Sequence, residues 1–372
     1  MIEYVEIRGS DTNIIGFVDI AKSIIWHSVY YGVGDFEIYM PETPAALDIL
    51  KIGHYVTRPD NAEVGIIESI NISDNEQDGT MITASGRFAK SILDRRLIYK
   101  LTGTSNAATI LRGNVETAVR EVVKNNAISC PFDSIRNMSI LTLGELSNIP
   151  LIIVDGNGNA AEKQVSYGNL LSYTDSVLEE YGLAAMCLLN SGKLQYKVYQ
   201  GSNRSIDNTD GNIPIIFSPE YDNLTASEYL YNATTEKNVV LIGGEGEGIN
   251  RFYSLITNGK TDLSRREVWI DASSISKTYK DDSDAEQQYT DDQYKSMLDA
   301  KGKQELAPLT PTEMFNGTID AVNGNWLYGR DFALGDIVTV QNNNFGIYTN
   351  VRIREATEVQ DGNGYTVEIK YQ

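Results

Sequence analysis

The first hundred residues alternate between short apolar runs and polar turn clusters. The apolar runs are rich in β-branched and aromatic residues, a composition typical of strands. Residues 75–79 (NEQDG) have the composition of a hairpin turn, and residues 88–97 (FAKSILDRRL) predict one or two helical turns. The clearest strand-like runs are residues 14–18 (IIGFV), 36–40 (FEIYM) and 64–67 (VGII). Residues 1–102 therefore predict an N-terminal β domain.

The hydrophobic period changes to three and four residues in the segment 103–214. Asn114 precedes an apolar stripe and can cap a helix by accepting a backbone hydrogen bond. The stripe consists of Val115, Ala118, Val119, Val122 and Val123. A second helix is expected at about 169–181 and is ended by Gly182. Its inward side chains are expected to be Leu170, Leu171, Val177, Leu178 and Tyr181. With a hairpin around 190–193, this segment predicts a small mixed α/β domain.

The strand pattern returns from about residue 215 and continues to the end of the chain. A DGNG turn at 361–364 precedes the most regular alternation in the sequence. Its apolar members are Tyr365, Val367, Ile369 and Tyr371. A polar insertion at 273–308 interrupts the pattern and contains a predicted helix at 291–306.

These periodicities together predict a mainly β protein with an α/β module, of the α+β class. Two β-barrel-like domains, residues 1–102 and 215–372, are expected to flank the mixed α/β domain at 103–214. A length of 372 residues agrees with several domains, since single cores rarely grow much beyond about 250 residues.

Charge and cysteine content narrow the class of protein. The 31 basic and 51 acidic residues give a net charge of -20, which disfavours the binding of nucleic-acid phosphates as the main function. Cys130 and Cys187 lack metal-type spacing and are expected to be buried free thiols. No apolar run approaches the roughly 18–20 residues of a membrane span, and the N-terminus lacks the pattern of a secretory signal. The chain is therefore expected to begin as mature protein and to insert into no membrane.

Candidates for catalysis are few. The chain has two histidines, His27 and His54, and both lie inside strand-like runs. A cysteine–histidine pair would have to combine one of them with Cys130 or Cys187, and the sequence contains neither a GxSxG nor an HExxH motif. No catalytic residue is predicted. Glycoside hydrolysis stays open, because it needs only two carboxylates at a suitable separation.

Two glycine-containing segments resemble phosphate-binding loops. Gly259, Lys260 and Thr261 match the end of such a loop, but Ser254 stands where the motif requires its first glycine, so a hairpin turn is expected. Residues 243–248 (GGEGEG) follow an apolar strand but carry two glutamates that would repel phosphate, so a sharp bend is expected there.

A cluster of acidic residues raises the question of calcium binding. Its members are Asp281, Asp282, Asp284, Asp291 and Asp292. The cluster lacks the ligand spacing and the glycine of a calcium-binding loop, so it predicts a solvated acidic segment. Neither a metal nor a cofactor is expected.

Three segments of the C-terminal third have a distinctive order: residues 215–248, residues 326–340 (WLYGRDFALGDIVTV) and the closing hairpin at 351–369. They resemble the tail-hub, or baseplate-hub, proteins of long-tailed phages and related tail-like particles. Residues 84–98 and 106–125 resemble the helical joint of the same proteins. Within residues 326–340, Gly335 and Asp336 match a Leu-Gly-Asp step of the family that sets a turn, and we expect a structural role for them.

The resemblance implies a structural hub protein rather than an enzyme. Such a chain would form a homotrimeric ring in the virion, at the tail tip or baseplate, after assembly in the host cytoplasm. The ring would join the tail tube and the distal tail protein to a fibre or spike, contact the tape-measure protein, and let DNA pass through its lumen without specific binding. The alternatives are a tail-associated glycan-degrading enzyme and a receptor-binding protein.

Overall fold

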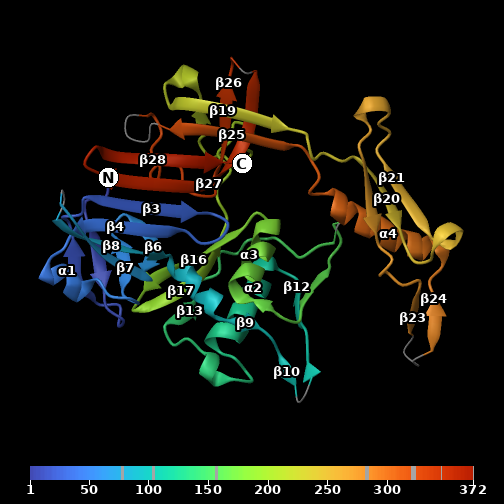
Figure 1. Cartoon of the computed structure of the whole chain (residues 1–372), viewed down its shortest axis with the longest axis horizontal. Coiled ribbons are helices and arrows are strands. Elements are labelled where there is room, and N and C mark those ends of the chain that lie inside the picture. The colour runs from blue at the N-terminus through green and yellow to red at the C-terminus, as the bar shows by residue number, and fades with distance from the viewer. Residues whose placement is uncertain are drawn as a thin grey trace. The chain divides into compact units, whose positions relative to one another are not determined.

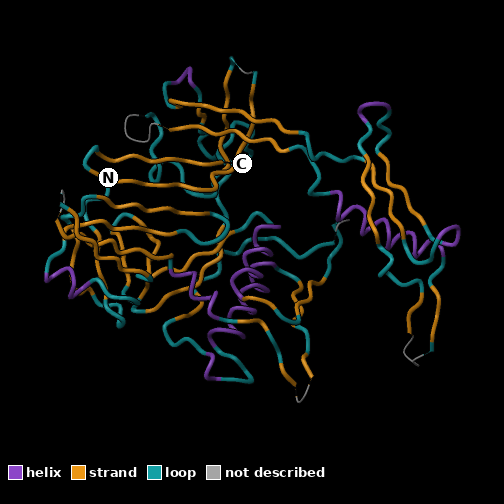
Figure 2. The backbone as a smooth tube through the Cα atoms, in the orientation of Figure 1, coloured by secondary structure: helices purple, strands orange, loops and turns teal. Residues whose placement is uncertain are grey.

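A computed structural model shows two compact units. Its described residues are 1–76, 79–102, 105–155, 158–280, 285–319, 324–344 and 346–371. The first unit contains Met1–Glu228 and Asn316–Gln372, and the second contains Tyr229–Phe315. Strands predominate in both units, and helices are concentrated in the middle of the chain and in the second unit (Figures 1 and 2).

A seven-stranded sheet forms the centre of the first unit. Its strand order is β13-β17-β16-β6-β5-β1-β2, so β2 and β13 are its two edges. The strands are β1 (Val5–Arg8), β2 (Ile14–Val18), β5 (Tyr55–Arg58), β6 (Asn61–Ile66), β13 (Leu141–Leu143), β16 (Ala184–Asn190) and β17 (Lys193–Tyr199). All four residues of β5 are buried, which shows that this part of the sheet is covered on both faces.

A ten-stranded sheet contains strands from both ends of the chain. Its main path is β19-β25-β28-β27-β3-β4-β8-β7, and β26 joins β27 to β18. The strands are β3 (Ser23–Val29), β4 (Asp35–Pro41), β7 (Ser69–Asn75), β8 (Gly79–Arg87), β18 (Ile216–Phe217), β19 (Leu224–Asn232), β25 (Thr312–Ile319), β26 (Ile337–Asn342), β27 (Ile347–Asp361) and β28 (Gly364–Tyr371). The antiparallel pairing of β27 with β3 connects the C-terminal hairpin to the N-terminal strands (Figure 1).

The two sheets pack against each other around an aromatic cluster. Val5, Ile7 and Val56 from the seven-stranded sheet share one apolar core with side chains of β3, β4 and β8. The Trp26 ring centroid lies 5.9 Å from that of Phe36 and 4.8 Å from that of Phe88. Trp26 and Phe36 each alternate with less buried neighbours along β3 and β4, so the side-chain period of two places both in this core. Phe88 follows the end of β8.

Helices cover the other face of the seven-stranded sheet. They are α2 (Val115–Val123), its π-helical continuation η2 (Lys124–Ile128), α3 (Leu170–Glu180) and the 3₁₀ helix η1 (Ala89–Arg95). Asn114 accepts a hydrogen bond from the Thr117 amide, and Asn169 accepts one from the Ser172 amide. Both predicted helices are confirmed, and Gly182 follows α3 with a φ of 67°.

Short elements complete the first unit. They are α1 (Pro44–Ile49), β9 (Leu97–Ile98), β10 (Leu101–Thr102), β11 (Ser105–Asn106), β12 (Thr109–Arg112), β14 (Glu162–Val165), β15 (Gly168–Asn169), η3 (Ser134–Arg136) and η4 (Pro219–Tyr221). Among them β12 pairs with β14, β10 with β11 and β9 with β15. Residues 77 and 78 of the predicted turn at 75–79 lie outside the described part of the chain.

In its described residues, the second unit contains a three-stranded sheet with a helix packed on it and a separate two-stranded sheet, β23-β24. The sheet order is β21-β20-β22, and α4 contacts β20 and β21. The elements are β20 (Val239–Gly243), η5 (Gly248–Asn250), β21 (Tyr253–Thr257), η6 (Asp262–Ser264), β22 (Glu267–Asp271), β23 (Thr278–Lys280), β24 (Glu286–Gln288) and α4 (Asp291–Leu306). The predicted helix at 291–306 is confirmed, and a capping box between Thr290 and Gln293 begins it.

The prediction of a mainly β fold is confirmed, with 43% of the residues in strands and 19% in helices. The predicted barrels are not found: in the described residues no sheet closes on itself. The boundaries after residues 102 and 214 stay a prediction. Strands from 1–102 and 215–372 share the ten-stranded sheet, and the predicted insertion at 273–308 lies within the second unit.

Candidate assembly surfaces

Both histidines have partners within the fold. On β3, His27 Nδ1 lies 3.2 Å from Asp35 Oδ2, and its Nε2 lies 3.3 Å from Glu355 Oε2. His54 Nδ1 lies 2.7 Å from the carbonyl oxygen of Ile49, at the end of α1. These contacts hold neighbouring segments together, and among the described residues no hydrogen bond joins either histidine to a cysteine.

The two cysteines are buried free thiols, as predicted. Cys187 lies on β16 in the core beneath the helices, and burial raises the pKa of its thiol to about 12. Cys130 Sγ lies 3.7 Å from Arg136 Nη1. A thiol with a raised pKa carries little thiolate at neutral pH, so Cys187 is a packing residue in this structure.

The glycine-containing loops are turns of the second unit. Gly259, with a φ of 78°, lies in the connection from β21 to β22. Since both strands pair with β20 rather than with each other, the predicted hairpin is wrong and the connection crosses over β20. The expected bend at 243–248 is confirmed: Gly246 has a φ of 102°, and a Cβ at Gly244 would lie 2.7 Å from the Tyr294 hydroxyl.

Only part of the acidic cluster lies within the described residues. Asp281, Asp282 and Asp284 lie outside the described residues. Asp291 and Asp292 occupy the first turn of α4, where negative charge favours the helix dipole. Throughout the described ranges, no group of three or more acidic, histidine or cysteine side chains is arranged to hold a metal ion. No helix within those ranges has the length and apolar character needed to cross a membrane.

Gly335 and Asp336 lie in a turn before β26, where they have the expected structural contacts. Gly335 has a φ of 90°, and a Cβ there would lie 2.2 Å from the Tyr30 ring. The Asp336 carboxylate accepts hydrogen bonds from the Ser202 amide at 2.7 Å and from Arg204 Nε at 3.0 Å. The turn therefore connects β26 to the segment that follows β17 and to the residues after β3.

A buried ionic cluster was missed by the sequence analysis. The Arg58 guanidinium contacts the Glu358 carboxylate at 3.0 and 2.9 Å and the Asp60 carboxylate at 3.0 and 2.7 Å. Tyr365 donates to Glu358 over 2.6 Å, and the guanidinium lies 5.2 Å from the Trp26 ring centroid. Burial alone would raise the pKa of Asp60, but the hydrogen bonds and charge of Arg58 outweigh it and lower that pKa. The cluster joins the two ends of the chain.

Edge strand β2 carries apolar side chains that are exposed to solvent and are not part of the core. These side chains are Ile14, Ile15 and Phe17, together with Ile20 just beyond the strand, and 42–55% of each is exposed. We call this set the β2 patch. An apolar edge strand offers both hydrophobic area and unpaired backbone groups to another chain. The run of consecutive apolar residues in IIGFV was the signal that could have indicated it.

The second unit presents an apolar sheet face of its own. Val240, Ile242 and Ile256 point toward α4, whereas the alternate residues point to the opposite face. On that face Leu241 stands opposite Leu255 in β21 and opposite Trp269 in β22. The exposed side chains are Leu241, Tyr253, Leu255 and Trp269, which we call the Trp269 face.

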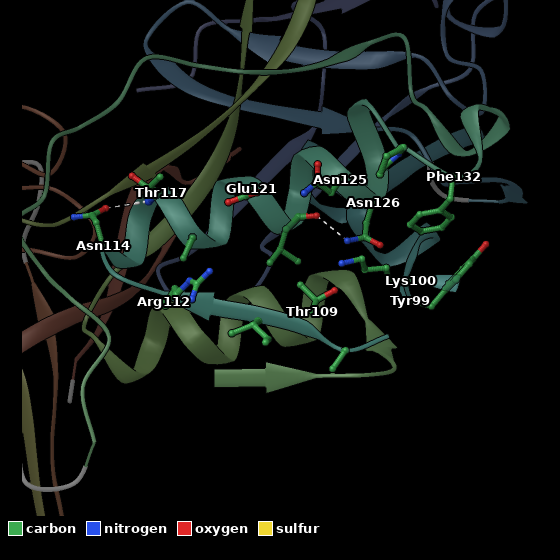
Figure 3. Close-up of a pocket in the computed structure, with 15 residues that line it drawn as sticks. Tyr99, Lys100, Thr109, Arg112, Asn114, Thr117, Glu121, Asn125, Asn126 and Phe132 are labelled. Atoms are coloured by element: carbon green, nitrogen blue, oxygen red, sulfur yellow. Dashed lines mark hydrogen bonds between the residues drawn. The ribbon is translucent and has the colours of Figure 1, made fainter. Parts of the chain in front are cut away.

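A pocket of about 550 Å³ lies between β12 and α2. Figure 3 shows Thr117 and Glu121 of α2 on one side and Thr109 and Arg112 of β12 on the other. One end of the pocket is bounded by an aromatic pair, Tyr99 and Phe132, with ring centroids 5.5 Å apart. The lining combines charged, amide and aromatic side chains, which offer a ligand both polar groups and apolar surface.

The comparison with known families decides the class of the protein. Residues 4–371 match the family of siphovirus ReqiPepy6 Gp37-like proteins. The chain belongs to this family. The resemblance to tail-hub proteins found in the sequence is thereby confirmed. No curated protein matches the sequence.

Two solved tail proteins share the fold of this Gp37-like protein. The 43 kDa tail protein of prophage MuSo2 from Shewanella oneidensis is 13% identical, with a TM-score of 0.57, over 100% of this chain and 98% of that one. The tail protein from Neisseria meningitidis MC58 is 14% identical, with a TM-score of 0.54, over 99% of this chain and 96% of that one. At these identities the likeness shows that this chain has the fold of those two tail proteins.

Proposed function

We propose that this Gp37-like protein is the hub of a phage tail tip or baseplate, a homotrimeric ring that joins the tail tube to a fibre or spike. The observation that carries this proposal is the extent of the likeness. The tail-protein fold covers the whole chain, so both compact units belong to that architecture rather than one being an unrelated appended domain.

The β2 patch is our candidate for the contact between copies. A seven-stranded sheet that ends in an apolar edge presents a surface that soluble monomers normally cover or make polar. Because a closed ring needs one surface of each copy to meet a different surface of the next, the contact is expected to be heterologous. Burial of Ile15 and Phe17 would supply hydrophobic free energy for it.

The Trp269 face is our candidate for contact with other tail components. The expected partners are the distal tail protein, the tape-measure protein and a fibre or spike. Exposed aromatic side chains are enriched in the cores of protein interfaces. On this face Arg251 lies over the Trp269 ring at 5.0 Å and pairs with Asp271, so the charges nearest to the indole are balanced.

The negative charge of the chain fits a conduit for DNA. Three copies, each with a net charge of -20, carry -60 together. A ring whose lumen is lined by acidic side chains repels DNA phosphates and lets the genome pass without adhering. In this proposal the protein assembles in the host cytoplasm and acts in the virion.

Solution mass, measured by light scattering with and without the distal tail protein, tests the ring. A mass near three times 41.2 kDa, alone or with the partner, is the expected result. Ile15→Lys in the β2 patch should reduce the trimer, whereas Ile135→Lys, at an exposed isoleucine of η3 outside the patch, should not. A wild-type protein that remains monomeric with its partner present contradicts the proposal.

A further inference from the structure

The wall of the pocket between β12 and α2 contains a rare helical geometry. After Val123 the helix widens into the π-helical turn η2, in which the Ser129 amide donates to the Lys124 carbonyl over 2.7 Å. Asn125 and Asn126 belong to this turn and line the pocket. Single π-helical turns are uncommon and recur at functional sites, because they turn side chains that an α-helix would direct elsewhere.

Asn126 has a buried acceptor without a partner. Its side-chain amide nitrogen donates to the Val122 carbonyl over 2.9 Å, and only 3% of the residue is exposed. Its Oδ1 has no hydrogen-bond partner among the residues that the structure describes. In Figure 3 the side chain points from the helix toward Lys100 and the aromatic pair. Buried acceptors are nearly always satisfied, so this oxygen indicates a donor that binds in the pocket.

The opposite wall is the unpaired edge of a strand. Within the described chain, β12 pairs with β14 and with no other strand. Thr109 and Ile110, which are consecutive in β12, both line the pocket, as does Ala108 just before the strand. Since side chains of consecutive strand residues point to opposite faces, contact with both Thr109 and Ile110 indicates that the strand edge, with its backbone groups, faces the pocket.

The aromatic end of the pocket is held in place by an arginine. The Arg136 guanidinium lies 4.1 Å from the Tyr99 ring centroid and 5.7 Å from that of Phe132. Arg136 also donates to the carbonyl of Leu97. The rings therefore form a fixed apolar surface at the end of the strand edge.

We propose that this pocket binds an extended peptide segment of a partner protein. The segment pairs with the free edge of β12, donates a backbone N–H to Asn126 Oδ1, and packs one apolar side chain on Tyr99 and Phe132. A strand edge favours a peptide over a glycan, because its alternating N–H and C=O groups match another peptide backbone. The inference goes beyond the proposed function, since it requires no ring.

Selection from a display library of short random peptides supplies the probe. Enriched peptides, labelled with fluorescein, are titrated against the full chain by fluorescence anisotropy. Asn126→Leu removes the acceptor and Tyr99→Ala removes part of the aromatic surface, and each should weaken binding at least about tenfold. Ser91→Ala is the matched control, because Ser91 Oγ is also buried without a hydrogen-bond partner among the described residues but does not line the pocket. Its peptide affinity should equal that of the wild type.

Hydrogen exchange tests the mode of binding. Bound peptide should slow exchange of the amides of Thr109–Arg112, as strand addition requires. If Asn126→Leu disturbs the π-helical turn, Tyr99→Ala still tests whether the peptide binds in the pocket.

The proposal is overturned if no enriched peptide depends on the pocket residues for binding, if a bound peptide leaves the amides of Thr109–Arg112 unprotected, or if chito-oligosaccharides displace the peptide. It is also overturned if the variants change the solution mass but not the peptide affinity, because a second copy of the chain would then occupy the pocket. If the protein forms no trimer but still binds the peptide, the proposed function is refuted and this inference is not.

Discussion

Arg58 and Glu358 lie 300 positions apart in the sequence and form a two-pronged ion pair in the interior of the first unit. Only 1% of the Arg58 side chain and 5% of the Glu358 side chain are exposed. Glu358 stands opposite Trp26 in the pairing of β27 with β3, and Arg58 ends β5 in the other sheet. This one contact therefore connects both sheets and both ends of the chain.

Removing one partner of this pair should destabilise the first unit strongly. Glu358→Gln leaves the buried guanidinium with Asp60 as its remaining carboxylate, and we expect a loss of about 3 kcal/mol in the free energy of unfolding. Urea unfolding followed by tryptophan fluorescence measures it. The control is Glu267→Gln, which breaks the exposed pair with Arg265 and should cost about 0.5 kcal/mol or less. If both variants lose the same free energy of unfolding, burial of the ion pair does not determine how much it contributes to stability.

Glu63 should make stability depend on pH. Burial raises the pKa of its carboxyl to about 7, although Ser28 donates to it and Lys90 lies near. Because the folded pKa exceeds the ordinary value of 4.5, the folded state favours the protonated form. The stabilisation, at most about 3 kcal/mol, is complete below pH 4.5 and is lost as the pH rises through 7.

Glu63→Gln separates this effect from that of other carboxyl groups. The variant cannot ionise at this position, so the difference in unfolding free energy between wild type and variant should change between pH 4.5 and pH 7.5. Urea unfolding across that range measures the difference. A constant difference for Glu63→Gln would mean that the Glu63 carboxyl has an ordinary pKa in the folded protein.

The sequence predicted local structure better than long-range pairing. The cap Asn114 with its apolar stripe, the helix of residues 291–306 and the alternation that ends at Tyr371 depend on neighbours within a few positions, and the structure contains all three. The pairing of Trp26 with Glu358 depends on which distant strands meet. Local periodicity contains no such information, so the sequence alone predicted barrels where the structure has open sheets.

The candidate sites could be predicted only where they depend on residues close together in the sequence. The polar insertion and the bend at 243–248 could be predicted, but no local pattern distinguishes the π-helical turn at Lys124–Ile128 from an ordinary helix. The pocket beside it also requires β12 to pair with β14, about 50 residues away. The Trp269 face is different, since Leu241 and Trp269 lie on strands of usual composition and only the placement of α4 decides which face is covered.

Gly335 should tolerate no side chain. Its φ of 90° disfavours other residues, and a Cβ would lie 2.2 Å from the Tyr30 ring. Gly335→Ala is therefore expected to lower the free energy of unfolding by at least about 2 kcal/mol, from backbone strain and overpacking together. Gly362→Ala is the control, because a Cβ there meets nothing within 4 Å and its φ is not in the left-handed region. Thermal unfolding compares the two, and similar melting temperatures would contradict the assigned contact with Tyr30.

The hydroxyl of Tyr294 should be important for the second unit. It accepts a hydrogen bond from the Glu245 amide over 2.7 Å and donates to the Ile275 carbonyl over 2.6 Å, and the residue is fully buried. Tyr294→Phe leaves both backbone groups without this partner, so we expect a loss of about 1–3 kcal/mol. Hydrogen exchange measures the loss, and we expect the amides of β20 and α4 to exchange faster in the variant. Tyr348→Phe, whose hydroxyl lies 3.4 Å from both carboxylate oxygens of the exposed Asp207, should leave exchange in these elements unchanged. Unchanged exchange in Tyr294→Phe would show that other groups hold the bend at 243–248 against α4.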